Sequence, residues 1–392
     1  MKRSLKMKNP RENHEWALSH KGRAVNELHP ASEVNLPLPL APARWDWHKV
    51  RRVLIVRLRS IGDTVLATPA LYALRRFLPE VQLDLLLENW VAPVLDGYTD
   101  IDHIITVERG NTFNRARLAR ELRAAHYDVA FNLHGGTTAT LLTRISKARH
   151  RVGYANYQYS GLHNHIAPPA AELWRKEEIH SVEQQLALLG WTGVPVSDLP
   201  PTRLAITENA LKSILAKLES AGLGQVQPLA VLHPAAAFAS KQWAIESFAR
   251  VAEYLAQYGL SVIAIAASHE RQMLTELQRQ AKTPIIAFTD LALPEVTALL
   301  SRARLFIGND SGIAHMASAI NTPSVVIFGS SNVTHWRPFN TIAKSIVVRE
   351  AMPCAPCPGY TCSEFDQPEC IRRVRVEQVT QAISVVLQQE RL

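Results

Sequence analysis

From residue 51 onward, short runs of apolar and β-branched residues alternate with longer amphipathic stretches. Strands are expected at 51–58, 81–88, 101–108 and 128–135, and helices at 68–78, 114–127 and 137–146. Strands that alternate with helices form right-handed βαβ units, which build a parallel sheet covered on both faces. The pattern therefore predicts an α/β fold.

The alternation breaks at residues 155–200, where only one helix, 180–190, is evident, and then starts again. Further helices are expected at 208–222, 244–259, 269–281, 293–303 and 311–320, and strands at 228–236, 260–268, 284–289, 304–310 and 324–330. A chain of 392 residues also exceeds what one hydrophobic core usually serves. We expect two Rossmann-like domains facing a central cleft, 49–195 and 196–392, with the C-terminal helix packing back on the first domain.

Residues 1–48 are rich in basic, Asn, His and Pro residues and show no sustained period, which predicts a flexible leader. The leader lacks the apolar core of a secretory signal, and no stretch of the chain approaches the roughly 18 apolar residues of a membrane-spanning helix. The net charge of +8 fits an anionic membrane surface or phosphorylated substrates, or simply a solvated surface. No basic stripe with interleaved aromatics is present, so nucleic acid is not an expected partner.

The first motif is RLRSIGDTVLATPAL, residues 57–71, between an expected strand and an expected helix. This position is the carboxyl edge of the first sheet, where open α/β sheets bind ligands. Gly62 permits a tight turn, and Ser60 and Thr64 add hydroxyl groups to the same loop. Asp63 is either a helix cap or a carboxylate that faces the cleft. The dinucleotide and P-loop glycine fingerprints are absent.

The second motif is RLFIGNDSGIAHMASAINTPSVVIFGSS, residues 304–331. A helix that opens near Gly312 presents free N–H groups and a positive dipole end, which suit a phosphate. Ser311 and Gly312 let the backbone come close, and His315 is either structural or a further phosphate ligand. Asp310 has the wrong charge to bind phosphate, so we expect it to cap the helix.

The third motif is VLHPAAAFASKQWAIESFARVAEYL, residues 231–255, in which Lys241 lies just before a helix. A lysine on a loop at the carboxyl edge of a sheet supplies a point charge for a diphosphate. The alternative is an exposed lysine without a ligand.

Together the three motifs resemble glycosyltransferase family 9, the bacterial heptosyltransferases that build the inner core of lipopolysaccharide. The resemblance covers about residues 51–375 and is most specific in RSIGDTVLATPAL, SKQW, and GNDSGIAHMASA followed by PSVVIFGSS. It implies a GT-B fold, a nucleotide-sugar donor, usually ADP-heptose, in the C-terminal domain, and an acceptor in the N-terminal domain. The chemistry it implies inverts the anomeric centre and needs no metal or other cofactor.

Carried over by motif, Asp63 is the general base that takes the proton of the acceptor hydroxyl, and Lys241 neutralises the departing diphosphate. The resemblance implies that Ser311, Gly312 and His315 hold the phosphates, and that Asp310 also lies on the donor side.

The resemblance extends to two less specific positions. Glu270 matches an acidic position that contacts the donor ribose. The family commonly has an acidic residue before an LHG-like turn, where this chain has Asn132 in FNLHGG. His134 of that turn is an acceptor-side candidate.

Cys354, Cys357, Cys362 and Cys370 lie within seventeen residues, with the spacing C-x2-C-x4-C-x7-C. The spacing is compatible with a structural four-thiolate zinc site, or the thiols are free. Neither alternative makes them the catalytic centre.

We therefore expect an inverting glycosyltransferase that moves a heptose or related sugar from an ADP-sugar to a lipid-linked core oligosaccharide of lipopolysaccharide. It would be cytoplasmic and peripheral on the inner face of the inner membrane. The alternatives are a GT-B-fold sugar-nucleotide epimerase or hydrolase, and a non-catalytic nucleotide-sugar-binding protein.

Overall fold

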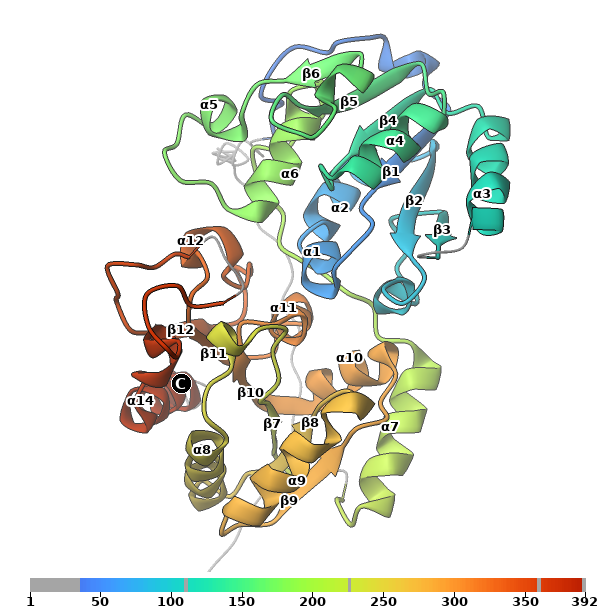
Figure 1. Cartoon of the computed structure of the whole chain (residues 1–392). Coiled ribbons are helices and arrows are strands. Elements are labelled where there is room, and N and C mark those ends of the chain that lie inside the picture. Colours follow the sequence, from blue (N-terminus) through green and yellow to red (C-terminus); the bar gives the residue numbers. More distant parts are fainter. Residues whose placement is uncertain (1–35, 109–111, 225–226, 358–360, 390–392) are drawn as a thin grey trace, which may run out of the picture. The chain divides into compact units, whose positions relative to one another are not determined.

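The structure is a computed structural model that describes residues 36–108, 112–224, 227–357 and 361–389 (Figure 1). Residues 37–392 form one compact unit. Residues 1–35 of the expected leader lie outside the described residues.

Six parallel strands form the first sheet, in the spatial order β3-β2-β1-β4-β5-β6. They are β1 (Arg52–Val56), β2 (Gln82–Glu88), β3 (His103–Val107), β4 (Val129–Asn132), β5 (His150–Tyr154) and β6 (His165–Ala167). The four strands expected in this region are present. β5 and β6 were not predicted from the sequence. They are short and rich in His, Arg and Gly, residues with little preference for strands.

Helices cover both faces of this sheet (Figure 1). They are α1 (Ile61–Val65), α2 (Thr68–Phe77), α3 (Thr112–Ala124), α4 (Thr137–Ile145), α5 (Ala170–Trp174) and α6 (Ser181–Gly190). Val53 and Ile55 of β1 belong to the apolar core that includes α2 and α6, whereas Leu54 and Val56 belong to a separate core with α3 and α4. Because alternate residues enter two buried layers, the strand reads as a continuous apolar run.

The second sheet repeats this architecture with six parallel strands in the order β12-β11-β10-β7-β8-β9. They are β7 (Leu229–His233), β8 (Ser261–Ile265), β9 (Ile285–Phe288), β10 (Ala303–Asn309), β11 (Ser324–Phe328) and β12 (Ser345–Arg349). β12 was not expected from the sequence. Two parallel six-stranded sheets confirm the α/β fold class.

The helices of the second domain are α7 (Glu208–Ser220), α8 (Ile245–Gln257), α9 (Arg271–Gln280), α10 (Leu293–Arg302), α11 (Gly312–Ala319), α12 (Val333–Trp336), α13 (Glu369–Arg372) and α14 (Val376–Gln389). The C-terminal helix α14 packs on α8, β11 and β12 of its own domain. This corrects the expectation that it returns to the first domain. Its apolar face, which includes Val379 and Ile383, is buried against the nearest sheet.

The described end of the leader is held on the first domain. The N–H of Leu40 donates to the carbonyl of Gly190 at 3.1 Å. Trp47 is buried, and its indole N–H donates to the carbonyl of Thr192 at 2.9 Å. These contacts attach residues 37–49 to the C-terminal end of α6.

Candidate active site

The strand order brings the candidate loops together in pairs. Numbered along the chain within its own domain, each sheet has the order 3-2-1-4-5-6, so the first and fourth strands are neighbours. The chain leaves these two strands in opposite directions, and ligands of open α/β sheets bind beside the carboxyl ends of strands at such a switch point. The loops after β1 and β4 carry Asp63 and His134, and the loops after β7 and β10 carry Lys241 and Asp310.

Asp63 belongs to a capping box at the start of α1. Ser60 is the N-cap residue, and its backbone N–H and its hydroxyl both donate to Asp63 Oδ2 at 3.0 Å. The other carboxylate oxygen, Oδ1, is paired with the guanidinium of Arg57. Burial favours the neutral carboxyl, but Arg57 and the Ser60 hydrogen bonds outweigh it and lower the pKa of Asp63 below its ordinary value. Asp63 is therefore an anion at neutral pH.

Arg57 was not identified from the sequence. It is buried, and its Nη1 donates to the carbonyl of Leu133 in the turn after β4. The one sequence signal is a basic residue that follows an apolar strand directly, since buried arginines are almost always paired.

The turn after β4 is organised by Asn132. Its side-chain oxygen accepts the N–H groups of His134 at 3.1 Å and Gly135 at 2.9 Å. A neutral amide thus orders the turn where the family commonly has an acidic residue. His134 Nδ1 is buried and has no hydrogen-bond partner in the described residues. Burial, together with the nearby Arg57 charge, lowers the pKa of His134 to about 4, so the imidazole is neutral at pH 7.

The first turns of α1 and α11 touch. A Cβ atom at Gly62 would lie 2.7 Å from His315 Cδ2, and one at Gly312 would lie 2.9 Å from Ile61 Cβ. Real Cβ atoms do not approach this closely, so both positions need glycine. This contact brings the loop of Asp63 next to the helix start that was expected to bind phosphate.

Three further polar groups lie at the starts of these helices, two hydroxyls and one imidazole. Thr64 is fully buried, and its Oγ1 has no hydrogen-bond partner in the described residues. His315 is also buried with Nδ1 unpaired among those residues, and burial lowers its pKa. Ser311 is the N-cap residue of α11, and its Oγ lies 3.2 Å from His233 Nδ1. Thr64 Oγ1 and His315 Nδ1 therefore have hydrogen-bonding capacity that the described residues do not use.

Lys241 ends a short 3-10 helix (Ala239–Lys241) after β7, and its Nζ donates to Asp310 Oδ2 at 2.7 Å. The hydroxyl of Ser331 donates to the same oxygen at 2.5 Å. Asp310 is buried, whereas the Lys241 side chain is about a quarter exposed. Asp310 therefore anchors the lysine and does not cap α11, whose N-cap residue is Ser311, contrary to expectation.

Glu270 ends another 3-10 helix (Ser268–Glu270) after β8, which is the neighbour of β7. Its Oε2 accepts the N–H of Ala267 at 3.0 Å, and Oε1 lies 4.0 Å from His269 Nε2. This places it at the same sheet edge as Lys241, one strand away.

The four cysteines are free thiols, of which Cys370 is buried. Cys357 Sγ donates to the carbonyl of Cys354 at 3.2 Å, and its N–H donates to Ser330 O at 2.9 Å. Among the described residues, no three His, Cys, Asp or Glu side chains are arranged to hold a metal ion.

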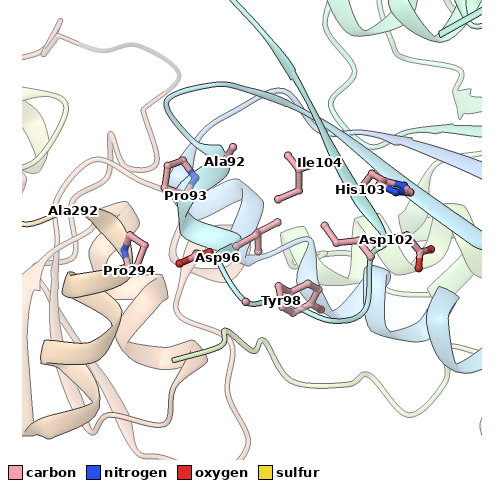
Figure 2. Close-up of a pocket in the computed structure, with 12 residues that line it drawn as sticks. Ala92, Pro93, Asp96, Tyr98, Asp102, His103, Ile104, Ala292 and Pro294 are labelled. Atoms are coloured by element: carbon pink, nitrogen blue, oxygen red, sulfur yellow. The ribbon is translucent and has the colours of Figure 1, made fainter. Parts of the chain in front are cut away.

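A pocket of about 590 Å³ lies elsewhere, between the segment that joins β2 to β3 and the start of α10 (Figure 2). Its polar lining includes Asp96, Asp102 and His103, with Pro294 on the opposite side. Asp102 is paired with Arg75 at 2.6 Å. This pocket does not include the Asp63 and Lys241 loops, so the candidate site rests on their chemistry and on the strand order.

The chain is similar to known proteins in sequence and in fold. The sequence model of glycosyltransferase family 9 (heptosyltransferase) matches residues 115–366. Lipopolysaccharide heptosyltransferase 3 of Escherichia coli K12 is 29% identical over 299 residues, which are 72% of this chain and 83% of the relative.

Two solved structures share the fold. The glycosyl transferase family 9 protein of Veillonella parvula has a TM-score of 0.75 at 23% identity, covering 86% of this chain and 97% of its own. The E. coli ADP-heptose lipopolysaccharide heptosyltransferase II has a TM-score of 0.73 at 20% identity. The match covers 87% of this chain and 100% of the E. coli chain. Because the family model spans well over half of the chain and the two sheets have the GT-B arrangement, this protein belongs to glycosyltransferase family 9 and is a glycosyltransferase.

Proposed function

We propose that the protein transfers a heptose, with inversion, from ADP-heptose to a core saccharide of lipopolysaccharide. The observation that carries the proposal is the contact between α1 and α11, which brings the loop of an anionic Asp63 against the helix start beside Lys241. Heptose as the sugar is supported by the lipopolysaccharide heptosyltransferase relative, and ADP by the name of the E. coli structure with the same fold.

In the proposed reaction, Asp63 accepts the proton of an acceptor hydroxyl while that oxygen attacks the anomeric carbon of the donor. The new C–O bond forms on the face opposite the diphosphate, and the old C–O bond breaks with its electron pair going to ADP. A sugar hydroxyl is a poor nucleophile, so a positioned base contributes about 10²–10⁴-fold to the rate.

The leaving diphosphate needs positive charge. We propose that Lys241 and the free N–H groups at Gly312 stabilise it, with the hydroxyl of Ser311 and the imidazole of His315 as further donors. Glu270, one strand away, would contact the ribose. The buried Asp310 keeps Lys241 in place.

We also propose that catalysis needs no metal ion. The sequence does contain one Asp-x-Asp pattern, Asp100 to Asp102, but Asp102 lines the pocket of Figure 2 and is paired with Arg75. Fixed cations and helix dipoles therefore have to stabilise the leaving group. A structural zinc at the four cysteines remains a separate proposal, tested by metal analysis of the purified protein.

The acceptor would place the protein at the cytoplasmic face of the inner membrane. No helix in the described part of the chain is both long and apolar enough to cross a bilayer. A net charge of +8 supports electrostatic attachment to anionic lipid, which salt weakens. Binding to anionic vesicles that persists unchanged at high salt would contradict this proposal.

The test of the function is incubation with ADP-heptose and a series of truncated lipopolysaccharide acceptors, with and without EDTA. We expect ADP release and an acceptor heavier by one heptose, equally in both conditions. Free heptose without a modified acceptor would indicate a hydrolase, and an altered donor would indicate an epimerase. Donor binding without any product would indicate a binding protein.

A further inference from the structure

Arg57 is a charged residue inside the first domain. It follows β1 directly, is 7% exposed, and its backbone N–H donates to Leu86 O at 3.1 Å, like a residue of the sheet. A buried charge is costly unless it is paired and hydrogen-bonded. Its contacts should therefore explain why the chain places an arginine here.

The guanidinium connects two loops of the site. One terminal nitrogen, Nη2, pairs with Asp63 Oδ1 in the loop after β1, and the other, Nη1, donates to Leu133 O in the turn after β4. Nε is buried without a partner in the described residues. The planar guanidinium, with several donors in fixed directions, makes both contacts at once.

The Asp63 carboxylate is held from both sides. Oδ1 receives the guanidinium of Arg57, and Oδ2 receives the N–H and the hydroxyl of Ser60. An ionised carboxylate offers about four acceptor positions, so about one remains for a ligand. The orientation of the carboxylate is thereby fixed, and a substrate hydroxyl has one place at which to donate.

We propose that Arg57 is a positioning residue of the transfer site, which fixes the Asp63 carboxylate relative to the turn that carries His134. The inference rests on the proposed function, in which Asp63 takes the acceptor proton. Arg57 itself does not have to touch the substrate.

The ionisation of Asp63 agrees with this role. Burial alone raises the pKa of the carboxyl, whereas the charge of Arg57 lowers it. Removing Arg57 leaves burial less opposed, so the pKa of Asp63 rises. Because a general base acts only when deprotonated, the acidic limb of the kcat/KM profile then moves to higher pH.

The experiment compares Arg57→Gln and Arg57→Lys with the wild type. For Arg57→Gln we expect kcat to fall about 10- to 100-fold through misplacement of the base. We also expect the acidic limb to move up by about 1–3 pH units, the usual effect of a neighbouring arginine on an aspartate. Arg57→Lys keeps the charge but has one compact donor group. The Arg57→Lys variant should keep the acidic limb of the kcat/KM profile near its wild-type position, while its kcat stays reduced.

A matched control is Arg75→Gln. Arg75 also pairs with an aspartate, Asp102 at 2.6 Å, and donates to Val81 O at 3.0 Å, within the same domain. The Arg75→Gln variant should be less stable than the wild type, but the acidic limb of its kcat/KM profile should not move. Folding of each variant is checked by circular dichroism, and donor binding by titration with ADP, which should stay within about twofold of wild type.

A second readout does not need turnover. Carbon-13 NMR of labelled aspartate, with Asp63 assigned from Asp63→Asn, gives the pKa of Asp63 directly, in the wild type and in any folded variant. A wild-type value at or above the ordinary value of about 3.9 would overturn the proposal. So would a folded Arg57→Gln variant with unchanged kcat and limb. If Asp63 titrates as expected but no heptose is transferred, the proposed function fails while the contact between Arg57 and Asp63 remains.

Discussion

Asp63 has two structural roles besides its proposed role as the general base. It completes the capping box of α1 through Ser60 and neutralises the buried Arg57. Replacing Asp63 with Asn removes the proposed base and also alters these contacts. An amide still accepts from Ser60, but it does not neutralise Arg57.

For Asp63→Asn we therefore expect two effects. Turnover should fall about 10²–10⁴-fold because the base is lost. The free energy of unfolding should fall by about 2 kcal/mol because a mostly buried guanidinium loses its counter-ion. Steady-state kinetics and urea unfolding measure the two effects, and ADP affinity should be unchanged.

The matched control for this variant is Asp102→Asn. Asp102 also accepts from an arginine, Arg75, and from a backbone N–H, that of Leu83 at 2.7 Å. The Asp102→Asn variant should be less stable than the wild type but should turn over at the wild-type rate. Near-normal turnover of a folded Asp63→Asn variant would instead make Asp63 a capping residue only.

Lys241 and Asp310 form the second charged pair of the site. Lys241→Met leaves the buried Asp310 with the Ser331 hydroxyl, so stability should fall by about 2 kcal/mol. The double variant Lys241→Met with Asp310→Asn removes the unpaired charge, and most of the stability should return. ADP affinity and turnover should stay low in both, as measured by calorimetry and kinetics. Recovery of ADP binding in the double variant would show that Lys241 has only a structural role.

At the scale of elements, the contact of α1 with α11 is the feature that creates the site. Gly62 and Gly312 allow two helix starts to approach until one backbone touches the other. The first N–H groups of α11 have no partner within the helix, and Asp63 lies in the first turn of α1. Small shifts between these helices would separate base from donor.

We expect Gly312→Ala to force these helices apart. The new Cβ would meet Ile61 Cβ at 2.9 Å and Gly62 N at 3.1 Å, so stability should fall by about 1–3 kcal/mol. Turnover should fall with ADP affinity, since misplacement of about 1 Å costs up to about 10²-fold. Gly224→Ala is the control, because a Cβ there meets nothing within 4 Å. A Gly312→Ala variant with wild-type kinetics would contradict the tight contact.

At the scale of the whole molecule, His180 connects the two sheet domains. Its Nδ1 accepts the N–H of Val182 at the start of α6, which leaves Nε2 protonated to donate to Arg337 O at 2.8 Å. The contact with Val182 requires the neutral imidazole, because a protonated ring carries a hydrogen on Nδ1, whereas the contact with Arg337 is possible in both states. Burial lowers the pKa of His180 to about 4.

This arrangement predicts a pH dependence of stability. In the unfolded chain His180 takes up a proton near pH 6.5, whereas in the folded protein it resists protonation down to about 4. Its contribution is therefore complete above about pH 6.5 and is lost as pH falls toward 4, at up to about 1.4 kcal/mol per pH unit. Urea unfolding at several pH values between 7 and 4.5 should show the loss. His180→Gln should reduce that slope, and an unchanged slope would contradict the assignment.

The sequence by itself determined the α/β class, most strands and helices, and the loops that carry Asp63, Lys241 and Ser311. Buried parallel strands are apolar runs, and helix starts after strands are local patterns, so neighbouring residues suffice to specify them. Only the tertiary structure decided that β1 lies beside β4 and β7 beside β10, which brings distant loops together. It also decided that Arg57 pairs with Asp63 and that Asp310 anchors Lys241. These partners depend on strand order and helix packing, which arise from contacts between residues far apart in the chain and leave no local pattern to read.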